Sequence, residues 1–319
     1  MMKILNIGSI NKDFFYSVDN LVKPGETVSS NKFDIKLGGK GLNQSVAISM
    51  AGNDVYHAGL INKNDLFIID KLKKWNVNSE NISLSETPTG HAIIQVDKNG
   101  ENSIIINGGS NHRLDVNFIN NTISKFNKDD YLLIQNEVNL VDKIIDIAYE
   151  KGLKIIFNPA PFNENIHNYN LNKVAILILN QTEGKSLSGE NNPEKIIKSI
   201  NEKLSNTEII LTLGKRGSIY SYKENTFSIN AEKVNSIDST GAGDTFIGYY
   251  IASIVKGISI KDSLIRAGKA AAISTTKLGA AESIPKINYR ASFFLSTKEF
   301  LPFLFFIRSK ASNNSPVAV

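Results

Sequence analysis

The stretch Tyr131–Asn158, YLLIQNEVNLVDKIIDIAYEKGLKIIFN, decides the fold class. Residues 131–135 form a short apolar run, and residues 154–158 form a second one that stops at Pro159. Between them, residues 140–151 repeat apolar side chains at helical spacing. Short, almost fully apolar runs are typical of strands buried on both faces of a parallel sheet. The stretch therefore predicts a strand, a helix and a second, parallel strand.

The same alternation continues along the rest of the chain. Further strands are expected at 3–7, 175–179 and 209–213, and further helices at 45–51, 196–204, 245–255 and 267–276. Strands that alternate with helices in this way form a mainly parallel central sheet with helices on both faces. The predicted fold class is α/β.

One segment interrupts the alternation. Residues 91–97 and 101–107 are both strand-like, and Lys98-Asn99-Gly100 joins them. Asn-Gly between β-prone runs is a strong hairpin signal, because both residues tolerate positive φ. The polar, β-prone segments 11–19 and 31–37 are expected to pair with this hairpin. We therefore predict a small antiparallel β lid, from about 11–37 and 91–107, that projects from the α/β body.

The composition is that of a globular protein and excludes several classes of site. The 319 residues are 41% hydrophobic and 21% charged, and 36 basic against 31 acidic residues give a net charge of +5. The lysines are dispersed, so no nucleic-acid partner is expected. With no cysteine, disulfides, thiolate metal sites and a cysteine nucleophile are excluded. No apolar run approaches the roughly 18–20 residues of a membrane span, and the first eight residues lack the apolar core of a signal peptide. A cytoplasmic protein without a membrane partner is expected.

A dense apolar run, FLPFLFFI at residues 300–307, stands near the end of the chain. Eight residues are too few to span a membrane. We expect a strand or short helix docked on the body; the alternatives are an interface patch or a membrane-surface anchor. The chain thus divides into an α/β domain at 1–290 and a C-terminal extension at 291–319 of unknown role.

The octet Ser239–Phe246, STGAGDTF, carries the first chemical signal. Glycines directly before a helix let backbone N–H groups converge on an anion at the helix N-terminus. Asp244 would lie in the first turn, where a carboxylate could take the proton of an attacking hydroxyl. The alternative is a glycine turn with Asp244 as a favourable first-turn charge. The sequence holds neither a Walker loop nor a true Gly-x-Gly-x-x-Gly, which disfavours P-loop and dinucleotide-binding proteins.

Another glycine cluster, the first along the chain, is GGKGLNQ at Gly38–Gln44, and it points to a polar ligand. Glycines let the backbone approach a ligand closely, and Asn43 can both donate to and accept from a hydroxyl. The alternative is a tight strand-to-helix turn with Asn43 as a helix cap. Asn11 and Asp13 are two residues apart on a predicted strand, so they share a face. An amide and a carboxylate placed in this way match adjacent hydroxyls of a sugar.

These motifs, in this order, resemble the PfkB carbohydrate-kinase family, in its ribokinase branch. Gly38–Asn43 is similar to the family's first signature, and Asp238–Gly248, DSTGAGDTFIG, is similar to the second. Several shorter matches support the resemblance, which extends over about residues 3–290. They lie at 24–27, 89–92, 97–102, 158–161, 180–183, 212–217 and 279–280.

The resemblance implies a ribokinase-like fold and ATP-dependent phosphorylation of a sugar's primary hydroxyl, with D-ribose converted to D-ribose 5-phosphate. By the same resemblance Asp244 is the catalytic base, and Gly241, Ala242 and Gly243 form the anion hole. The implied sugar-binding residues are Asn11, Asp13, Gly39, Lys40, Gly41, Leu42, Asn43, Glu137 and Asp244.

The resemblance also implies sites for ATP, Mg²⁺ and K⁺. Asn180 and Glu183 match an Asn-x-x-Glu motif that organises magnesium and phosphate through water. The implied nucleotide-binding residues are Thr212, Leu213, Gly214, Lys215, Arg216, Gly217, Gly243 and Gly268, the last at an adenine-pocket position where many relatives carry Asn or His. A potassium site, formed mostly by backbone carbonyls, is implied around Asp238, Thr240, Ser274, Lys277, Gly279 and Ser283. The lid of this family covers the sugar and often joins two subunits, so a homodimer through the lid is expected.

Three alternatives stay open at this point. The first is a related kinase acting on deoxyribose, fructose or a nucleoside. The second is a non-catalytic sugar sensor on the same fold, which the presence of Asp244 and its glycines disfavours. The third is a nucleic-acid binder, which is suggested only by the basic sequence pI of about 9.0.

Overall fold

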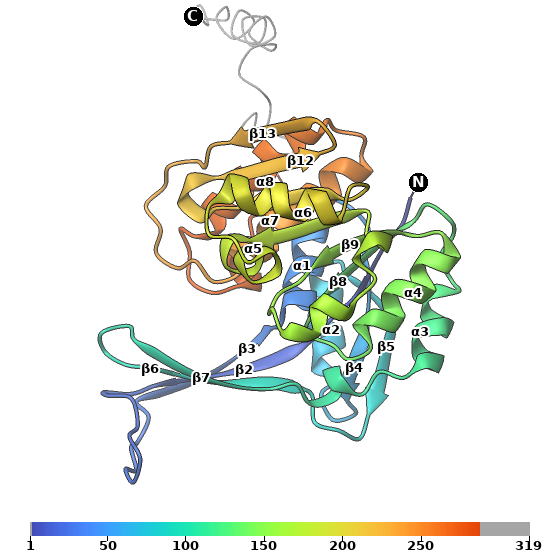
Figure 1. Cartoon of the computed structure of the whole chain (residues 1–319). Coiled ribbons are helices and arrows are strands. Elements are labelled where there is room, and N and C mark those ends of the chain that lie inside the picture. The colour runs from blue at the N-terminus through green and yellow to red at the C-terminus, as the bar shows by residue number, and fades with distance from the viewer. Residues whose placement is uncertain (1, 288–319) are drawn as a thin grey trace, which may run out of the picture. The chain divides into compact units, whose positions relative to one another are not determined.

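A nine-stranded sheet forms the centre of the protein in a computed structural model, which describes residues 2–287 (Figure 1). The strand order is β13-β12-β11-β10-β9-β8-β1-β4-β5. All pairings from β11 to β5 are parallel, and β12 and β13 add an antiparallel edge. The bounds are β1 Ile4–Ile7, β4 Tyr56–Asn62, β5 Asn78–Ser85, β8 Tyr131–Gln135, β9 Lys154–Asn158, β10 Ile176–Asn180, β11 Glu208–Thr212, β12 Ser218–Tyr222 and β13 Asn225–Ile229. The predicted α/β class, with a mainly parallel sheet, is confirmed.

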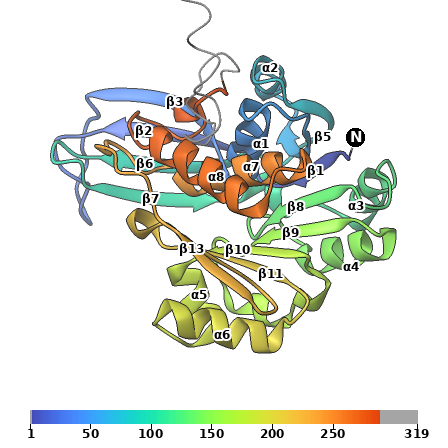
Figure 2. The same ribbon diagram turned by 90° about the horizontal axis from the view of Figure 1, so that it is seen from above.

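Helices cover both faces of this sheet, and each face has its own hydrophobic core (Figure 2). One face is packed by α1 (Lys40–Met50), α2 (Phe67–Lys74), α7 (Ala242–Val255) and α8 (Ile260–Ser274). The other is packed by α3 (Val116–Ile123), α4 (Val141–Lys151), α5 (Gln181–Ser188) and α6 (Pro193–Lys203). Two buried faces explain why the central strands are apolar without alternation.

The stretch that decided the fold class folds as predicted. Strand β8 pairs in parallel with β9, and α4 makes the crossover between them. Ile144, Ile145 and Ala148 form the buried stripe of α4. The helix ends at Gly152, whose φ of 81° suits the left-handed conformation that glycine adopts at helix ends.

The predicted lid is a separate sheet of four strands within the described residues, in the order β3-β2-β6-β7. Figure 1 shows it projecting from the body, with bounds β2 Asn11–Ser17, β3 Lys32–Gly38, β6 Gly90–Val96 and β7 Asn102–Asn107. The pairs β2–β3 and β6–β7 are antiparallel, as predicted, while β2 and β6 join in parallel. This join follows from the connections: β2 leaves β1 and β6 leaves β5 at the same edge of the parallel sheet, so both strands set out in the same direction.

The sequence did not single out several elements, among them α2, α3, α5, β4, β5 and the β12–β13 hairpin. Strands β5 and β13 lie at the two edges of the sheet. Their sequences, NSENISLS and NTFSI, are largely polar and lack the apolar runs of the central strands. The apolar run at 300–307 lies outside the described residues. Within residues 2–287, no helix has the length and hydrophobicity required to cross a membrane.

Candidate active site

Helix α1 begins inside the first glycine cluster, at Lys40, five residues earlier than its apolar pattern suggested. Its first turn lies directly on the end of β1. A Cβ at Gly41 would stand 2.4 Å from the backbone nitrogen of Ser9, so only glycine fits there. The Leu42 N–H donates to the carbonyl of Ser9 at 2.9 Å, and the Leu42 side chain is buried in the core. Close packing of helix on strand thus brings Lys40 and Asn43 to the carboxyl edge of the sheet.

The second glycine cluster along the chain, in Ser239–Phe246, forms the N-terminus of α7. Gly241 has a φ of 74°, a left-handed conformation that glycine adopts without strain, and the helix begins at Ala242. Asp244 is the third residue of the helix, so its predicted place in the first turn is confirmed. A Cβ at Gly243 would meet no atom within 4 Å, because this residue faces open space. The positive end of the helix dipole therefore faces the pocket described next.

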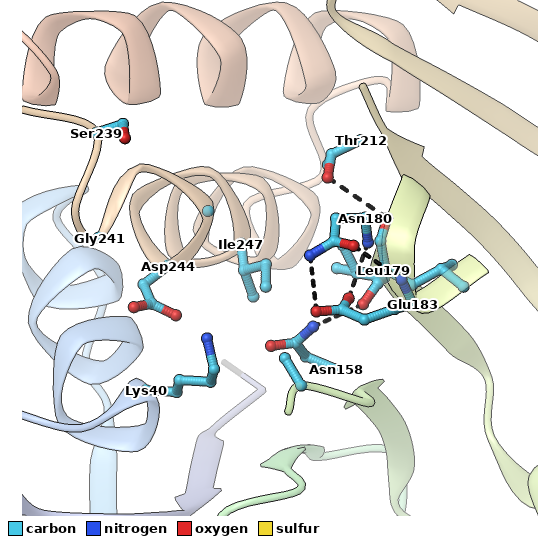
Figure 3. A pocket seen from close by; sticks show the side chains of 13 residues that line it. Lys40, Asn158, Leu179, Asn180, Glu183, Thr212, Ser239, Gly241, Asp244 and Ile247 are labelled. Atoms are coloured by element: carbon cyan, nitrogen blue, oxygen red, sulfur yellow. Dashed lines mark hydrogen bonds between the residues drawn. The ribbon is translucent and has the colours of Figure 1, made fainter. Parts of the chain in front are cut away.

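A cavity of about 250 Å³ lies between these two helix N-termini and the carboxyl ends of β9, β10 and β11 (Figure 3). In open α/β sheets, ligands bind outside this edge of the strands. Seven of the predicted site residues line the cavity: Lys40, Asn180, Glu183, Thr212, Gly241, Gly243 and Asp244. The remaining lining residues are Asn158, Ala160, Ile178, Leu179, Ser239 and Ile247.

The Asp244 carboxylate is buried and held by two amides of α1. Asn43 donates to Oδ2 through Nδ2 at 3.1 Å, and Gln44 donates to Oδ1 through Nε2 at 2.9 Å. The first glycine motif and the second are thus in direct contact, although about two hundred residues separate them. The Oδ1 atom of Asn43 is buried and has no donor among the described residues. A ligand hydroxyl could supply that donor.

Lys40 points its ammonium group into the cavity, towards the space beside Asp244 (Figure 3). The negative charge of Asp244 raises the pKa of Lys40, with further help from Glu137 and Glu183, and these effects outweigh the opposing effect of burial. Lys40 is therefore a fixed cation. Among the described lining residues it is the one basic side chain, against the carboxylates of Asp244 and Glu183.

The predicted sugar-binding residues lie around the N-terminus of α1 and the base of the lid. Glu137 accepts hydrogen bonds from Ser9 Oγ at 2.5 Å and from the Lys40 N–H at 2.9 Å, and burial raises its pKa. The Asn11 Oδ1 atom accepts from Asn111 Nδ2 at 2.8 Å. Burial, followed by the charges of Glu137 and Glu282, raises the pKa of Asp13 to about 6. Ser9 precedes strand β2 and Glu137 follows β8, so their hydrogen bond brings the base of the lid next to the end of β8.

The Asn-x-x-Glu motif begins helix α5 as a capping box. Asn180 Oδ1 accepts from the Glu183 N–H at 2.9 Å, and Glu183 Oε2 accepts from the Asn180 N–H at 2.8 Å. A third bond joins Asn180 Nδ2 to Glu183 Oε1 at 2.8 Å. Burial raises the pKa of Glu183. The pair therefore has a structural task and, at the same time, presents its side chains to the cavity (Figure 3).

The predicted nucleotide loop follows β11, at the side of the cavity that Thr212 lines. Residues Gly214–Arg216 form a single 3-10 turn, and Arg216 Nη2 donates to Gln181 Oε1 at 2.5 Å. A Cβ at Gly214 or at Gly268 on α8 would meet no atom within 4 Å, so both glycines face open space. Leu213, Lys215, Arg216, Gly217 and Gly268 do not line the cavity itself.

The residues predicted around a cation tie the loop before α7 to the loop after α8. Asp238 Oδ1 accepts from the N–H of Thr240 at 2.9 Å and from its hydroxyl, and Oδ2 accepts from the Gly279 N–H at 2.9 Å. Burial raises the pKa of Asp238, but these three bonds outweigh burial and hold it below its ordinary value. The hydroxyls of Ser274 and Ser283 donate to backbone carbonyls, and Lys277 is exposed.

Four residues of this site were missed as functional residues: Ser9, Gln44, Asn111 and Asn158. Gln44 and Asn158 had a signal, because the first ends the glycine heptad and the second ends a buried strand directly before Pro159. Asn111 lies in a short 3-10 segment, where no periodicity marks it. Among residues 2–287, no three histidine, aspartate or glutamate side chains gather into a metal cluster.

A buried carboxylate in the first turn of a helix, an ammonium group beside it, and a cavity at the carboxyl edge of a parallel sheet suit the transfer of a charged group to a hydroxyl. A model of the "pfkB family carbohydrate kinase" matches residues 1–287. The chain therefore belongs to the PfkB family of carbohydrate kinases and is a sugar kinase.

Three relatives illustrate the similarity. A ribokinase of Haemophilus influenzae is 36% identical over 301 residues, which cover 89% of this chain and 96% of the relative. A deoxyribokinase of Salmonella typhi is 30% identical, with 90% and 96% coverage. The structure of an Arabidopsis thaliana ribokinase complexed with ribose and ATP superposes with a TM-score of 0.80 at 26% identity, with 89% and 96% coverage. The ribokinase-like fold is confirmed.

Proposed function

We propose that this protein transfers the γ-phosphoryl group of ATP to the primary hydroxyl of D-ribose, giving D-ribose 5-phosphate and ADP. The observation that carries the proposal is the contact of Asp244 with Asn43, which joins the candidate base to a candidate sugar ligand in one buried cluster. The similarity to ribokinases, including one that holds ribose and ATP, supports the choice of sugar and nucleotide.

The chemistry follows from the charges around the cavity. Asp244 takes the proton of the primary hydroxyl while the hydroxyl oxygen forms a bond to the γ-phosphorus. At the same time the bond between the γ-phosphorus and the β–γ bridging oxygen breaks, and ADP leaves. Negative charge grows on the transferred group and on the leaving ADP. The backbone N–H groups of Gly241–Gly243, at the positive end of α7, and the ammonium of Lys40 stabilise that charge.

The sugar end of the site supplies several polar groups, of which Asn11 and Asn43 are buried and Asp13 and Glu137 half-buried. Asn11, Asp13, Asn43 and Glu137 offer amide and carboxylate groups suited to vicinal hydroxyls, and Asn43 Oδ1 has no donor among the described residues. Such a site rejects an analogue that lacks one hydroxyl, because its own polar groups then go unpaired. We therefore infer ribose as the acceptor, ahead of deoxyribose, fructose and nucleosides.

A substrate panel tests this function directly. We expect kcat/KM with ATP to be highest for ribose among ribose, 2-deoxyribose, fructose and adenosine. The deoxyribokinase relative makes 2-deoxyribose the alternative that matters most. A clear preference for any of the other three would contradict ribose as the substrate while leaving a PfkB-type kinase intact.

The raised pKa of Asp13 predicts a pH dependence of sugar affinity. The ionised carboxylate accepts hydrogen bonds from hydroxyls, and its pKa of about 6 means that it gains a proton as the pH falls through that value. Ribose affinity should therefore weaken by about tenfold per pH unit below 6 if only the ionised form binds. Calorimetry of ribose binding between pH 5 and 8 measures this. Asp13→Asn should bind more weakly but with a flat profile; an unchanged slope would contradict the role of Asp13.

We infer that Mg²⁺ accompanies the nucleotide. The cavity carries two carboxylates, Asp244 and Glu183, against the one ammonium of Lys40, so a bare polyphosphate would meet net negative charge. The residues fit a hard cation held through water, since Asn180 and Glu183 line the cavity and carry the amide and carboxylate oxygens that such an ion prefers. These residues would hold the ion through water, and the bound ion would neutralise phosphate charge. Thr212 and the loop after it would receive the nucleotide.

We also infer a K⁺ site between the loops that flank α7 and α8. The residues that would hold the ion offer hard oxygens, the Asp238 carboxylate and backbone carbonyls of the loop after α8. The hydroxyls of Ser274 and Ser283 donate to backbone carbonyls. The three hydrogen bonds to Asp238 keep its carboxylate ionised and tie both loops together. A bound K⁺ would neutralise charge there and order the loop that precedes Gly241–Gly243.

Potassium should therefore activate the enzyme saturably, and sodium much less. Turnover would be measured at fixed Mg²⁺ and ATP while KCl is titrated against NaCl in a Tris buffer free of both ions. Asp238→Ala should blunt the activation more than it weakens ribose binding, because Asp238 contacts the loops and not the cavity. Equal rates in both salts would rule out the site.

The lid supports a homodimer, which we propose as the assembly. Residues that pair directly across strands share a face, and one such row is Ile35–Phe14–Ile93–Ile105. Ile35, Ile93 and Ile105 are exposed, as is Phe33 two residues before Ile35 on the same face. An apolar face of this kind on a projecting sheet is typical of an interface. The matching face of a second copy would cover it.

Sedimentation analysis tests the dimer. The wild-type chain should sediment as a dimer, and Ile105→Lys should shift it towards a monomer because a charge would have to be buried in the interface. Leu84→Lys is the matched control, since Leu84 is equally apolar and exposed but lies on β5 outside the lid. A wild-type monomer would contradict the proposal.

We also propose the cytoplasm as the location of this protein, which fits a chain without cysteine that uses ATP and a free sugar as substrates.

A further inference from the structure

Gln44, the last residue of the first glycine heptad, is the buried contact of the candidate base that the mechanism above does not use. Its side chain is fully buried and does not line the cavity. The Nε2 atom donates to Asp244 Oδ1 at 2.9 Å and to Asn158 Oδ1 at 3.2 Å, while Oε1 accepts from Gln135 Nε2 at 2.7 Å. Every polar atom of this amide therefore has a partner.

The orientation of the Gln44 amide is determined by a chain of amides that starts at a carbonyl. The Gly41 carbonyl can only accept, so Asn6 must turn Nδ2 towards it, at 2.7 Å. This leaves Asn6 Oδ1 to accept from Gln135 Nε2 at 3.1 Å. The same Nε2 group then donates to Gln44 Oε1, so the Gln44 NH₂ group must face the other way, towards Asp244.

A second carbonyl enforces the same result independently. Asn158 donates through Nδ2 to the Ile178 carbonyl at 2.9 Å, which leaves Asn158 Oδ1 to accept from Gln44 Nε2. A reversed Gln44 amide would place its oxygen against both Asn158 Oδ1 and the Asp244 carboxylate. The two anchors are the Gly41 carbonyl in the first turn of α1, reached through Asn6 on β1, and the Ile178 carbonyl in the middle of β10, reached through Asn158 on β9. Together they permit one orientation of the Gln44 amide only.

We propose that Gln44 is a positioning residue: it holds the Asp244 carboxylate through Oδ1, so that Oδ2, which accepts one hydrogen bond from Asn43, keeps a lone pair to take the substrate proton. The proposal rests on the kinase function inferred above. In this arrangement the hydrogen-bonded amides of Asn6, Gln135 and Gln44 hold the Asp244 carboxylate from the protein interior. The substrate hydroxyl would approach Asp244 from the cavity. A misplacement of about 1 Å at such a group can cost about 10²-fold in rate.

Gln44→Leu tests the proposal, because it keeps the approximate volume and removes the donor. We expect kcat to fall by about 10²-fold, with KM for ribose and ATP changed by less than about threefold. Thr207→Val is the matched control: it removes a buried hydrogen bond, from Oγ1 to the Val174 carbonyl at 2.9 Å, far from the cavity. It should lower the Tm without changing kcat.

Gln135→Glu tests the relay without touching Asp244. A carboxylate cannot donate to both Asn6 Oδ1 and Gln44 Oε1, so Gln44 loses the constraint on its orientation. We expect a slower kcat with little change in KM. The double variant with Gln44→Leu should be no more than about twofold slower than Gln44→Leu alone, because both act through one contact. Losses that simply multiply would overturn the relay, as would a Gln44→Leu enzyme with wild-type kcat.

The failure of this inference can be distinguished from failure of the proposed function. A wild-type enzyme that phosphorylates a sugar other than ribose overturns the choice of substrate, and the tests above proceed with that sugar. If no sugar is phosphorylated, the function fails, and a double-mutant cycle of Gln44→Leu with Asp244→Asn in urea unfolding decides the contact. Coupled unfolding midpoints would support the positioning of Asp244 by Gln44, and additive midpoints would overturn it.

Discussion

Asp244→Asn is expected to lower kcat by at least about 10²-fold while leaving the fold and ribose binding intact. The amide is nearly isosteric with the carboxylate, and its oxygen can still accept from Gln44 Nε2. What it cannot do is take the proton of the attacking hydroxyl. The loss should therefore appear in kcat, measured with ribose and ATP, and not in the ribose affinity measured by calorimetry.

Asp262→Asn provides the matched control for this variant. Asp262 also lies in the first turn of a helix, α8, where it accepts a hydrogen bond from Ser259, but it is exposed and distant from the cavity. It should cost a little stability through the helix dipole and leave kcat unchanged. An Asp244→Asn enzyme that turns over at a near wild-type rate would remove Asp244 from the mechanism.

Lys40→Met should lower kcat by about 10²–10³-fold, the range for loss of one preorganised group that stabilises transition-state charge. Methionine keeps the length of the side chain but removes the one ammonium among the described residues that line the cavity. The negative charges of Asp244 and Glu183 then lose their counter-charge, and the transferred phosphoryl group loses a partner. KM for ATP is expected to rise as well, because the ammonium attracts the phosphates before the reaction.

Lys173→Met is the control for the loss of a lysine charge as such. Lys173 forms a surface ion pair with Asp146 at 2.7 Å, away from the cavity. Its removal should leave kcat and KM unchanged, since exposed ion pairs contribute little. If Lys40→Met retained wild-type kcat, the charge of Lys40 would have no part in phosphoryl transfer.

The fold could be predicted to the extent that burial leaves a mark on the sequence. The central strands β8, β9 and β10 are apolar because helices cover both of their faces. The lid hairpin could be predicted from the turn residues Asn99-Gly100. The edge strand β5 escaped prediction because its side chains are largely polar. The parallel join of β2 to β6 depends on how two distant connections leave the sheet, which no local pattern records.

The candidate site divides in the same way. Asp244 could be placed in the first turn of a helix from the glycines before it, because that relation is local. The partners of Asp244 could not be derived from spacing, since Asn43 and Gln44 reach it across about two hundred residues. Gln135 and Asn158 ended predicted strands, yet only the order of those strands in the sheet brings both to Gln44.

The position of β1 in the interior of the sheet has a consequence for biosynthesis and refolding. This first strand lies between β4 and β8, so one of its two neighbours emerges from the ribosome more than a hundred residues later, as the Lys3–Asp130 hydrogen bond illustrates. Asp244 follows another hundred residues after that. Contacts between such distant segments form slowly. The active site is thus completed only when nearly the whole α/β body has assembled, and recovered kinase activity would report the last step of refolding and not an early one.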